Sequence, residues 1–153
     1  MGADVRLLEE PFDPAAKLAA FTAGQEEAGG IVSFLGQVRT GGRGEALEPR
    51  HYAPLTLPGM QALATEALRR WPLHGLLVLH RSGTMRPGDP IVLVAAAARH
   101  RRDAFAAAEF AMDHLKSESW FWKREKVGGA WHWVEPRDVD FADLARWSDP
   151  AQV

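Results

Sequence analysis

The sequence predicts a fold that mixes helices and strands, because three segments carry clear and different periodicities. Residues 58–71 place apolar side chains at the three- and four-residue spacing of an amphipathic helix, and Pro72 ends that pattern. Residues 91–97 are apolar throughout, which is typical of a strand covered on both faces. Residues 120–125 alternate, and a turn containing two glycines leads to a returning strand at 131–134.

Weaker signals predict the remaining elements. Asp13 followed by Pro14 is a typical helix start. Gly36 indicates a bulge within a strand. Pro49, Pro54 and Pro58 punctuate the chain in and just after the segment 45–57, and we expect His51 and Tyr52 to lie in a loop. The other expected elements are strands at 5–8, 31–39 and 76–81, and helices at 14–23, 103–116 and 138–147. The inward stripe expected for the helix at 103–116 is Phe105, Ala108, Met112 and Leu115.

The composition restricts the classes of function. With 153 residues, 46% of them hydrophobic and 25% charged, the chain is expected to form a single domain over residues 1–153. Its net charge of −2 gives no overall attraction to nucleic acid or membranes, so any anion site must be local. The histidines lack the spacing of metal ligands, and we expect neither a metal nor a cofactor.

The chain contains no cysteine. Disulfides, thiolate metal sites and a cysteine nucleophile are therefore excluded, and a protein of this kind that handles sulfur must receive it on another molecule. The N-terminus lacks the pattern of a signal peptide, and the longest apolar run, at 91–98, is far too short to cross a bilayer. We expect a cytoplasmic protein.

Lysine is rare and concentrated. Three of the four lysines of the chain, Lys116, Lys123 and Lys126, lie within eleven residues and among tryptophans, whereas nearly all other cations are arginine. Lysine, unlike arginine, loses its proton when it is crowded or buried, and then acts as a nucleophile or a base. The alternative is that these lysines only keep a strand edge in solvent.

Two arginine-containing segments are candidates for binding an anion. His100 and Arg101 precede a predicted helix, whose free N–H groups favour a phosphate or carboxylate. The alternative is a solvated basic turn that pairs with nearby acids such as Asp103. Arg39 adjoins a glycine-rich segment at 40–44, which could wrap an anion but matches no phosphate-loop pattern, so for the glycines alone a hairpin tip is the preferred interpretation.

Several short segments occur in an ordered series that resembles the large catalytic subunit of molybdopterin synthase. The resemblance extends from about residue 30 to residue 147. Each segment is weak alone, but their order and spacing are specific. The segments are HRSG at 80–83, PGD at 87–89, HR at 100–101, AF at 104–105, LK at 115–116 and WKRE at 122–125.

This resemblance implies an α+β fold, with a hammerhead-like α/β domain and an antiparallel β subdomain. It implies a sulfurtransferase of molybdenum cofactor biosynthesis, which places two sulfurs on cyclic pyranopterin monophosphate to form the dithiolene of molybdopterin. The sulfur comes as a thiocarboxylate on the Gly-Gly tail of a small ubiquitin-like partner. The assembly implied is a homodimer within a heterotetramer.

The resemblance also implies roles for six residues. Lys116 and Lys123 are the catalytic lysines, with Lys116 facing the carbonyl of the partner's tail and Lys123 serving as acid, base or oxyanion support. In such enzymes, residues at the positions of His100 and Arg101 serve the pocket of the dimer mate. The residues implied to bind the anionic pterin are Arg39, His100, Arg101 and Arg137.

Some positions depart from the family pattern. Residues 53–57 separate His51 and Tyr52 from the segment at 58–60, where relatives run on almost directly, and Trp120 stands where proline is common. Two other readings stay open at this point. One is a non-catalytic anion- or RNA-binding module that uses arginines and stacked tryptophans, and the other is a non-catalytic homologue kept as a scaffold.

Overall fold

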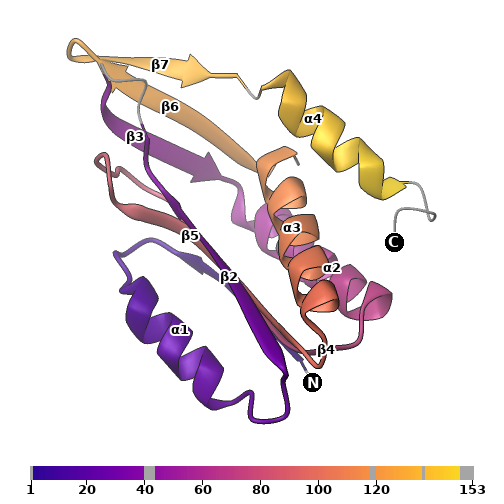
Figure 1. The fold of residues 1–153 in the computed structure, drawn as a ribbon. Helices are drawn as coiled ribbons and strands as arrows, with labels where there is room; N and C mark the ends of the chain where they lie inside the picture. The colour runs from indigo at the N-terminus through magenta and orange to yellow at the C-terminus, as the bar shows by residue number, and fades with distance from the viewer. Residues whose placement is uncertain (1, 40–43, 118–119, 136, 149–153) are drawn as a thin grey trace.

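The computed structural model describes residues 2–39, 44–117, 120–135 and 137–148, and shows the predicted α+β fold (Figure 1). A four-stranded sheet has the strand order β1-β4-β5-β2, and a three-stranded antiparallel sheet has the order β3-β6-β7. The elements are β1 (Gly2–Leu8), α1 (Pro14–Ala23), β2 (Gly30–Gln37), β3 (Gly44–His51), α2 (Ala53–Arg70), β4 (Leu73–Arg81), β5 (Pro90–Ala98), α3 (Arg101–Ser117), β6 (Phe121–Val127), β7 (Ala130–Val134), α4 (Asp138–Ala145) and the short 3-10 helix η1 (Arg146–Ser148).

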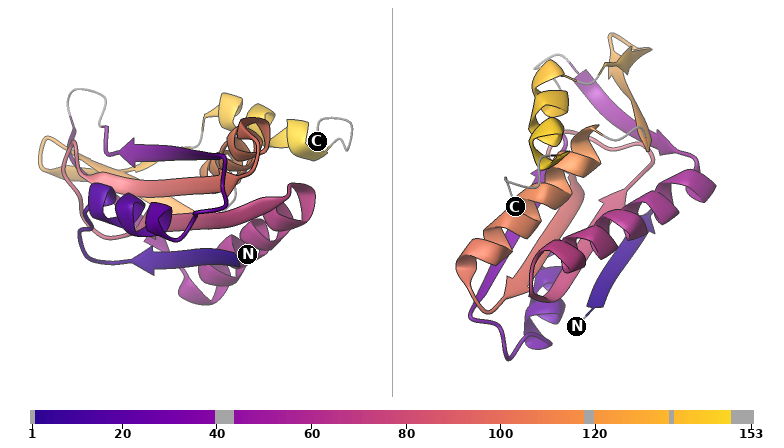
Figure 2. Two further views of the ribbon diagram at one scale, coloured as in Figure 1. Left: turned by 60° about the horizontal axis from the view of Figure 1, so that its bottom comes forward. Right: turned by 90° about the vertical axis from the view of Figure 1, so that its right-hand side faces the viewer.

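The larger sheet is covered on both faces, as the apolar run at 91–97 predicted. Strand β5 lies between β4 and β2 and is antiparallel to both, while β1 runs parallel to β4. Leu93 and Ala95 pack toward α1, whereas Val94 and Ala96 pack toward α2 and α3. Figure 2 shows α1 separated from α2 and α3 by the sheet. The core therefore lies mainly between this sheet and α2 and α3.

Helix α3 has a different inward face from the one predicted at its start. Phe105 is 60% exposed, whereas Ala104 is fully buried. Small side chains allow the helix to approach the sheet closely, and one residue along a helix turns the side chain by about 100°. The prediction for Phe105 was therefore wrong, while Ala108 and Leu115 are buried and Met112 packs against the core.

Helix α2 begins at Ala53 and β3 ends at His51, so the loop predicted for His51 and Tyr52 is wrong for His51, while Tyr52 connects the strand to the helix. The first part of the segment 45–57 belongs to β3. Pro54 lies in the first helical turn, where a backbone N–H is not needed. Thr56 is fully buried, and its hydroxyl lies 2.9 Å from the carbonyl oxygen of Trp120 and 3.1 Å from that of Tyr52. This long-range contact holds the extra turn in place.

The smaller sheet extends the molecule beyond the β4–β5 turn (Figure 1). Its β6–β7 hairpin turns at Gly128 and Gly129, which have φ angles of 58° and 80°. Positive φ values favour glycine, which explains the turn predicted there. Leu47 and Met85 exchange two backbone hydrogen bonds of 2.8 Å and so tie β3 to the β4–β5 connection.

Several smaller predictions are confirmed. Asp13 caps α1 by accepting hydrogen bonds from two backbone N–H groups, at 3.0 and 3.3 Å. The register of β2 against β5 shifts at Gly36, where a bulge was predicted. The closing helix forms as α4 and η1, and Trp147 packs against α3 and α2. The glycine-rich segment at 40–43 and the tail after residue 148 lie outside the described residues. No helix in the described part of the chain is long and apolar enough to span a membrane.

Candidate functional site

The structure brings Lys116 and Lys123 close enough for the charge of one to affect the pKa of the other. Lys116 lies in the last turn of α3, and Lys123 is the third residue of β6, the next element of the chain. Burial is the main reason that the pKa of Lys123 falls to about 8, and the charge of Lys116 lowers it further. Asp140 acts in the opposite direction. Lys116 is itself exposed. The amine of Lys123 is therefore partly unprotonated near neutral pH.

The alternation of β6 explains why Lys123 points inward. Side chains two residues apart share a face of a strand, so Lys123 shares its face with Phe121. Phe121 packs against the core and stacks on the ring of His80, with centroids 3.8 Å apart and planes inclined by 19°. In register, Lys123 lies between Pro49 of β3 and Val134 of β7. The strand thus carries the amine into a half-buried position.

His80 is a site residue for which the sequence analysis gave no role. It is buried, and burial and the charge of Lys123 lower its pKa to about 3. Its Nδ1 lies 2.9 Å from the carbonyl oxygen of Arg81. Because a carbonyl only accepts, Nδ1 carries the hydrogen and Nε2 keeps a lone pair. His80 therefore stays neutral beside the lysines at neutral pH.

His51 completes a row of three rings with Phe121 and His80. Its ring meets that of Phe121 edge-on, with centroids 5.9 Å apart. Its Nδ1 is buried without a hydrogen-bond partner among the described residues. The resemblance left the role of His51 open because of the extra residues at 53–57. The segment HRSG contained His80, but only the pairing of β3 with β6 places His51 here.

Arg137 is connected to this region through Asp140, an acid in the first turn of α4. It precedes α4, and its Nη2 and Nε lie 3.2 and 3.5 Å from the carboxylate oxygens of Asp140. The side chain of Asp140 is only 12% exposed, whereas that of Arg137 is 64% exposed. The charge of Asp140 in turn raises the pKa of Lys123. Arg137 is thus linked to the lysine pair by one carboxylate.

His100 and Arg101 lie at the other end of α3 from Lys116. Lys116 follows Arg101 by fifteen residues along the helix, a rise of roughly 22 Å. With Arg102 and Phe105, they line an open hollow of about 460 Å³. Within one chain, these two predicted binding residues do not join the lysines.

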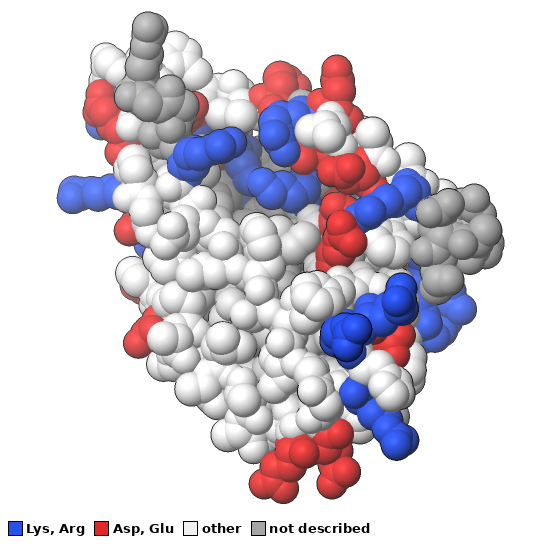
Figure 3. Space-filling model, viewed as in Figure 1, with Lys and Arg blue, Asp and Glu red and all other residues white. Residues whose placement is uncertain are grey.

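Arg39 lies just beyond β2, at the end of the sheet nearer to Lys116. Helix α3 returns across the sheet after β5, and β2 is antiparallel to β5. Hence α3 and β2 run in similar directions, and both Arg39 and Lys116 follow at their C-terminal ends. Arg39 is exposed, and its neighbour Val38 is held by hydrogen bonds with Asp89 and Gly88. Basic side chains gather near this rim and near the start of α3, around a largely uncharged surface (Figure 3).

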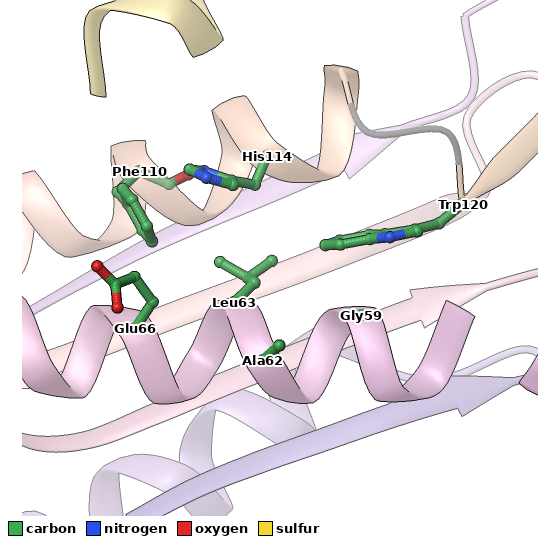
Figure 4. Close-up of a pocket in the computed structure, with 7 residues that line it drawn as sticks. All are labelled: Gly59, Ala62, Leu63, Glu66, Phe110, His114 and Trp120. Atoms are coloured by element: carbon green, nitrogen blue, oxygen red, sulfur yellow. The ribbon is translucent and has the colours of Figure 1, made fainter. Parts of the chain in front are cut away.

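A groove of about 250 Å³ between α2 and α3 ends at Trp120, three residues ahead of Lys123 (Figure 4). The indole lies flat against Gly59, where an added Cβ would come within 2.4 Å of the indole nitrogen. Leu63 and His114 line the middle of the groove, and Glu66 lies toward its far end. Among the described residues, no group of three histidine or acidic side chains is arranged to hold a metal ion.

Comparison with known proteins gives a consistent result. The family model described as "MoaE protein" matches residues 7–118. The molybdopterin synthase catalytic subunit of Cereibacter sphaeroides is 48% identical over 139 residues, which cover 90% of this chain and 95% of that protein. The solved structure of molybdopterin cofactor biosynthesis protein E from Burkholderia multivorans is 42% identical, with a TM-score of 0.81 and coverage of 97% and 99% of the two chains. The structure of molybdopterin synthase from Staphylococcus aureus is 28% identical, with a TM-score of 0.77 and coverage of 86% and 96%.

Proposed function

The chain belongs to the MoaE family and is a sulfur-transferring enzyme of molybdenum cofactor biosynthesis, and we propose that Lys116 and Lys123 carry its chemistry. The substrate is cyclic pyranopterin monophosphate. The sulfur donor is the thiocarboxylated Gly-Gly tail of a small ubiquitin-like subunit. Residues 1–153 act as one catalytic domain in this proposal.

The observation that supports this proposal most directly is the state of Lys123. Burial and the Lys116 charge hold its pKa near 8, so that both the protonated and the free amine are populated near neutral pH. General acid–base catalysis is most effective with such a group. Lys123 therefore exchanges protons with the substrate or supports the developing oxyanion, while the exposed Lys116 faces the tail carbonyl.

The anionic pterin is bound by cations from two copies of the chain. Arg137 and Arg39 lie at the lysine end of the molecule and contact the phosphate by charge-assisted hydrogen bonds. His100 and Arg101 lie at the far end of α3, so they serve the site only if a second copy presents them. A homodimer, extended by one small subunit per copy to a heterotetramer, meets this requirement. We place the assembly in the cytoplasm.

The RNA-binding alternative has partial support in the structure. Trp71 and Trp147 are buried core residues that offer no stacking surface to a base, whereas Trp122 and Trp133 are exposed. Arg124 lies over the Trp131 ring and is paired with the buried Glu48, which leaves it poorly placed to bind a phosphate. A steep salt dependence of RNA binding, with no effect of the pterin, would favour this alternative.

The decisive experiment mixes the protein with the thiocarboxylated small subunit and the cyclic phosphate, and identifies the product by mass analysis. Lys116→Ala is expected to abolish formation of molybdopterin while leaving the fold intact. Lys126→Ala is the matched control, because it removes another lysine of the same cluster. Lys126 lies on the same strand as Lys123 but three residues further along, so its side chain is on the opposite face from the proposed site. Near-normal turnover of Lys116→Ala would remove Lys116 from the mechanism.

A further inference from the structure

Asp140 is a buried acid next to two residues of the proposed site. Its side chain lies in the first turn of α4 and is largely screened from solvent. A carboxylate loses hydration on burial and is stable there only with cationic or hydrogen-bonding partners. Arg137 supplies one such partner through two nitrogen–oxygen contacts of 3.2 and 3.5 Å.

The second cation that Asp140 affects is Lys123. Charges act on Lys123 from two elements, Lys116 from α3 and Asp140 from α4, and Lys123 in turn lowers the pKa of His80 on β4. Burial keeps His80 neutral at neutral pH. Lys116 is cationic, so the carboxylate of Asp140 offsets a like-charge repulsion between the two amines.

A simpler role for Asp140 is stabilisation of the helix. Acids in a first turn interact favourably with the helix dipole, and such a role needs no burial. Asp138 lies in the same turn, is exposed, and suffices for that purpose. Asp140 differs because it faces inward and pairs with a residue expected to bind substrate.

We infer that Asp140 is a positioning residue that holds Arg137 by direct contact and acts on the nearby Lys123 through its charge, so that one buried carboxylate serves both the phosphate-binding and the proton-transferring group of the site. This inference rests on the proposed function for the roles of Arg137 and Lys123. Asp140 occupies the Nε and Nη2 edge of the guanidinium, so the Nη1 side of the exposed Arg137 stays available to a phosphate.

A titration of the lysine side chains tests the link without any substrate. The chain has only four lysines, so protein labelled with 13C at lysine Cε gives few signals, which lysine-to-arginine variants assign. Asp140 raises the pKa of Lys123, so Asp140→Asn is expected to lower its titration midpoint, by about half a pH unit or more. Asp138→Asn removes an acid from the same helical turn and is expected to leave that midpoint unchanged.

Steady-state kinetics provide the second measurement. In Asp140→Asn, the KM for the pterin phosphate is expected to rise several-fold, because Arg137 loses the carboxylate that holds its guanidinium in place. The part of the pH profile of kcat/KM that reflects titration of Lys123 is expected to move to lower pH. Asp140→Glu keeps the charge and is expected to restore both values in part. A purely helix-stabilising role would move neither.

An unchanged Lys123 midpoint in a folded Asp140→Asn protein overturns the inference. If that variant does not fold, Arg137→Gln decides instead, because loss of the guanidinium leaves the carboxylate to act on Lys123 alone. The midpoint is then expected to rise, and a constant value overturns the link. Since the titration needs no turnover, an inactive wild-type protein would refute the proposed function, whereas the link from Asp140 to Arg137 and Lys123 would still be decided by the titration.

Discussion

The two ends of α3 carry the same sign of charge in opposite surroundings. At its start, His100, Arg101 and Arg102 line an open hollow with an exposed phenylalanine. At its end, Lys116 adjoins a half-buried Lys123. Arginine in solvent keeps its charge and binds anions, whereas a buried lysine becomes titratable. The difference shows that exposure, as well as residue type, separates a binding cation from a reactive one.

The largest expected effect is at the buried end. Lys123→Arg keeps a positive charge but replaces a titratable amine by a group that stays protonated, so kcat is expected to fall by about 10²- to 10⁴-fold. Single-turnover formation of molybdopterin measures it. Retained activity would reduce Lys123 to an electrostatic role and remove the contrast between the two ends.

Mixing two inactive variants tests whether the two ends of α3 work on different subunits. Lys116→Ala and Arg101→Ala each spoil every site of their own dimers. After subunit exchange, half of the dimers are mixed and each has one intact site, so about a quarter of the wild-type activity is expected. Turnover of the mixture, compared with each variant alone, measures this. No recovery would mean that each site uses cations of a single chain.

Burial of Lys123 also predicts an effect on stability. Its pKa is about 8 in the folded protein and 10.5 ordinarily, so the unfolded chain binds more protons between these values and the free energy of unfolding rises with pH across that window. Below pH 8 the buried charge is a cost. Lys123→Met is therefore expected to stabilise the protein at pH 7 by about 1–3 kcal/mol in urea unfolding. An unchanged midpoint would mean that solvent reaches the amine.

The smallest expected effect is at the exposed end. Phe105→Ala removes a mostly exposed ring and is expected to change the free energy of unfolding by about 0.5 kcal/mol or less. Phe110→Ala on the same helix is the matched comparison, because that ring is fully buried and its loss is expected to cost about 3–5 kcal/mol. Urea unfolding at low protein concentration measures both.

Local patterns predicted most of the helices and strands, since Asp13, the hairpin glycines and the apolar run of β5 act through neighbours in sequence. The start of α2 was missed because Thr56 is held by Trp120, 64 residues away. Phe105 was misplaced because the alanines beside it decide the inward face.

The site was less predictable than the fold. Resemblance indicated Lys116 and Lys123, but no local signal joined His80, His51 and Asp140 to them. His80 and His51 come from β4 and β3, and Asp140 from α4. Their roles depend on burial and on charges that only the folded chain brings near, which spacing in sequence does not encode.

The flat contact between Gly59 and Trp120 limits which residues can replace either one. The indole fills the space that any side chain at position 59 would need. The two positions must therefore change together. A bulkier residue at position 59 requires a smaller residue than tryptophan at position 120. Transplanting the β6–β7 hairpin together with Trp120 into a relative would require a glycine at the position of Gly59.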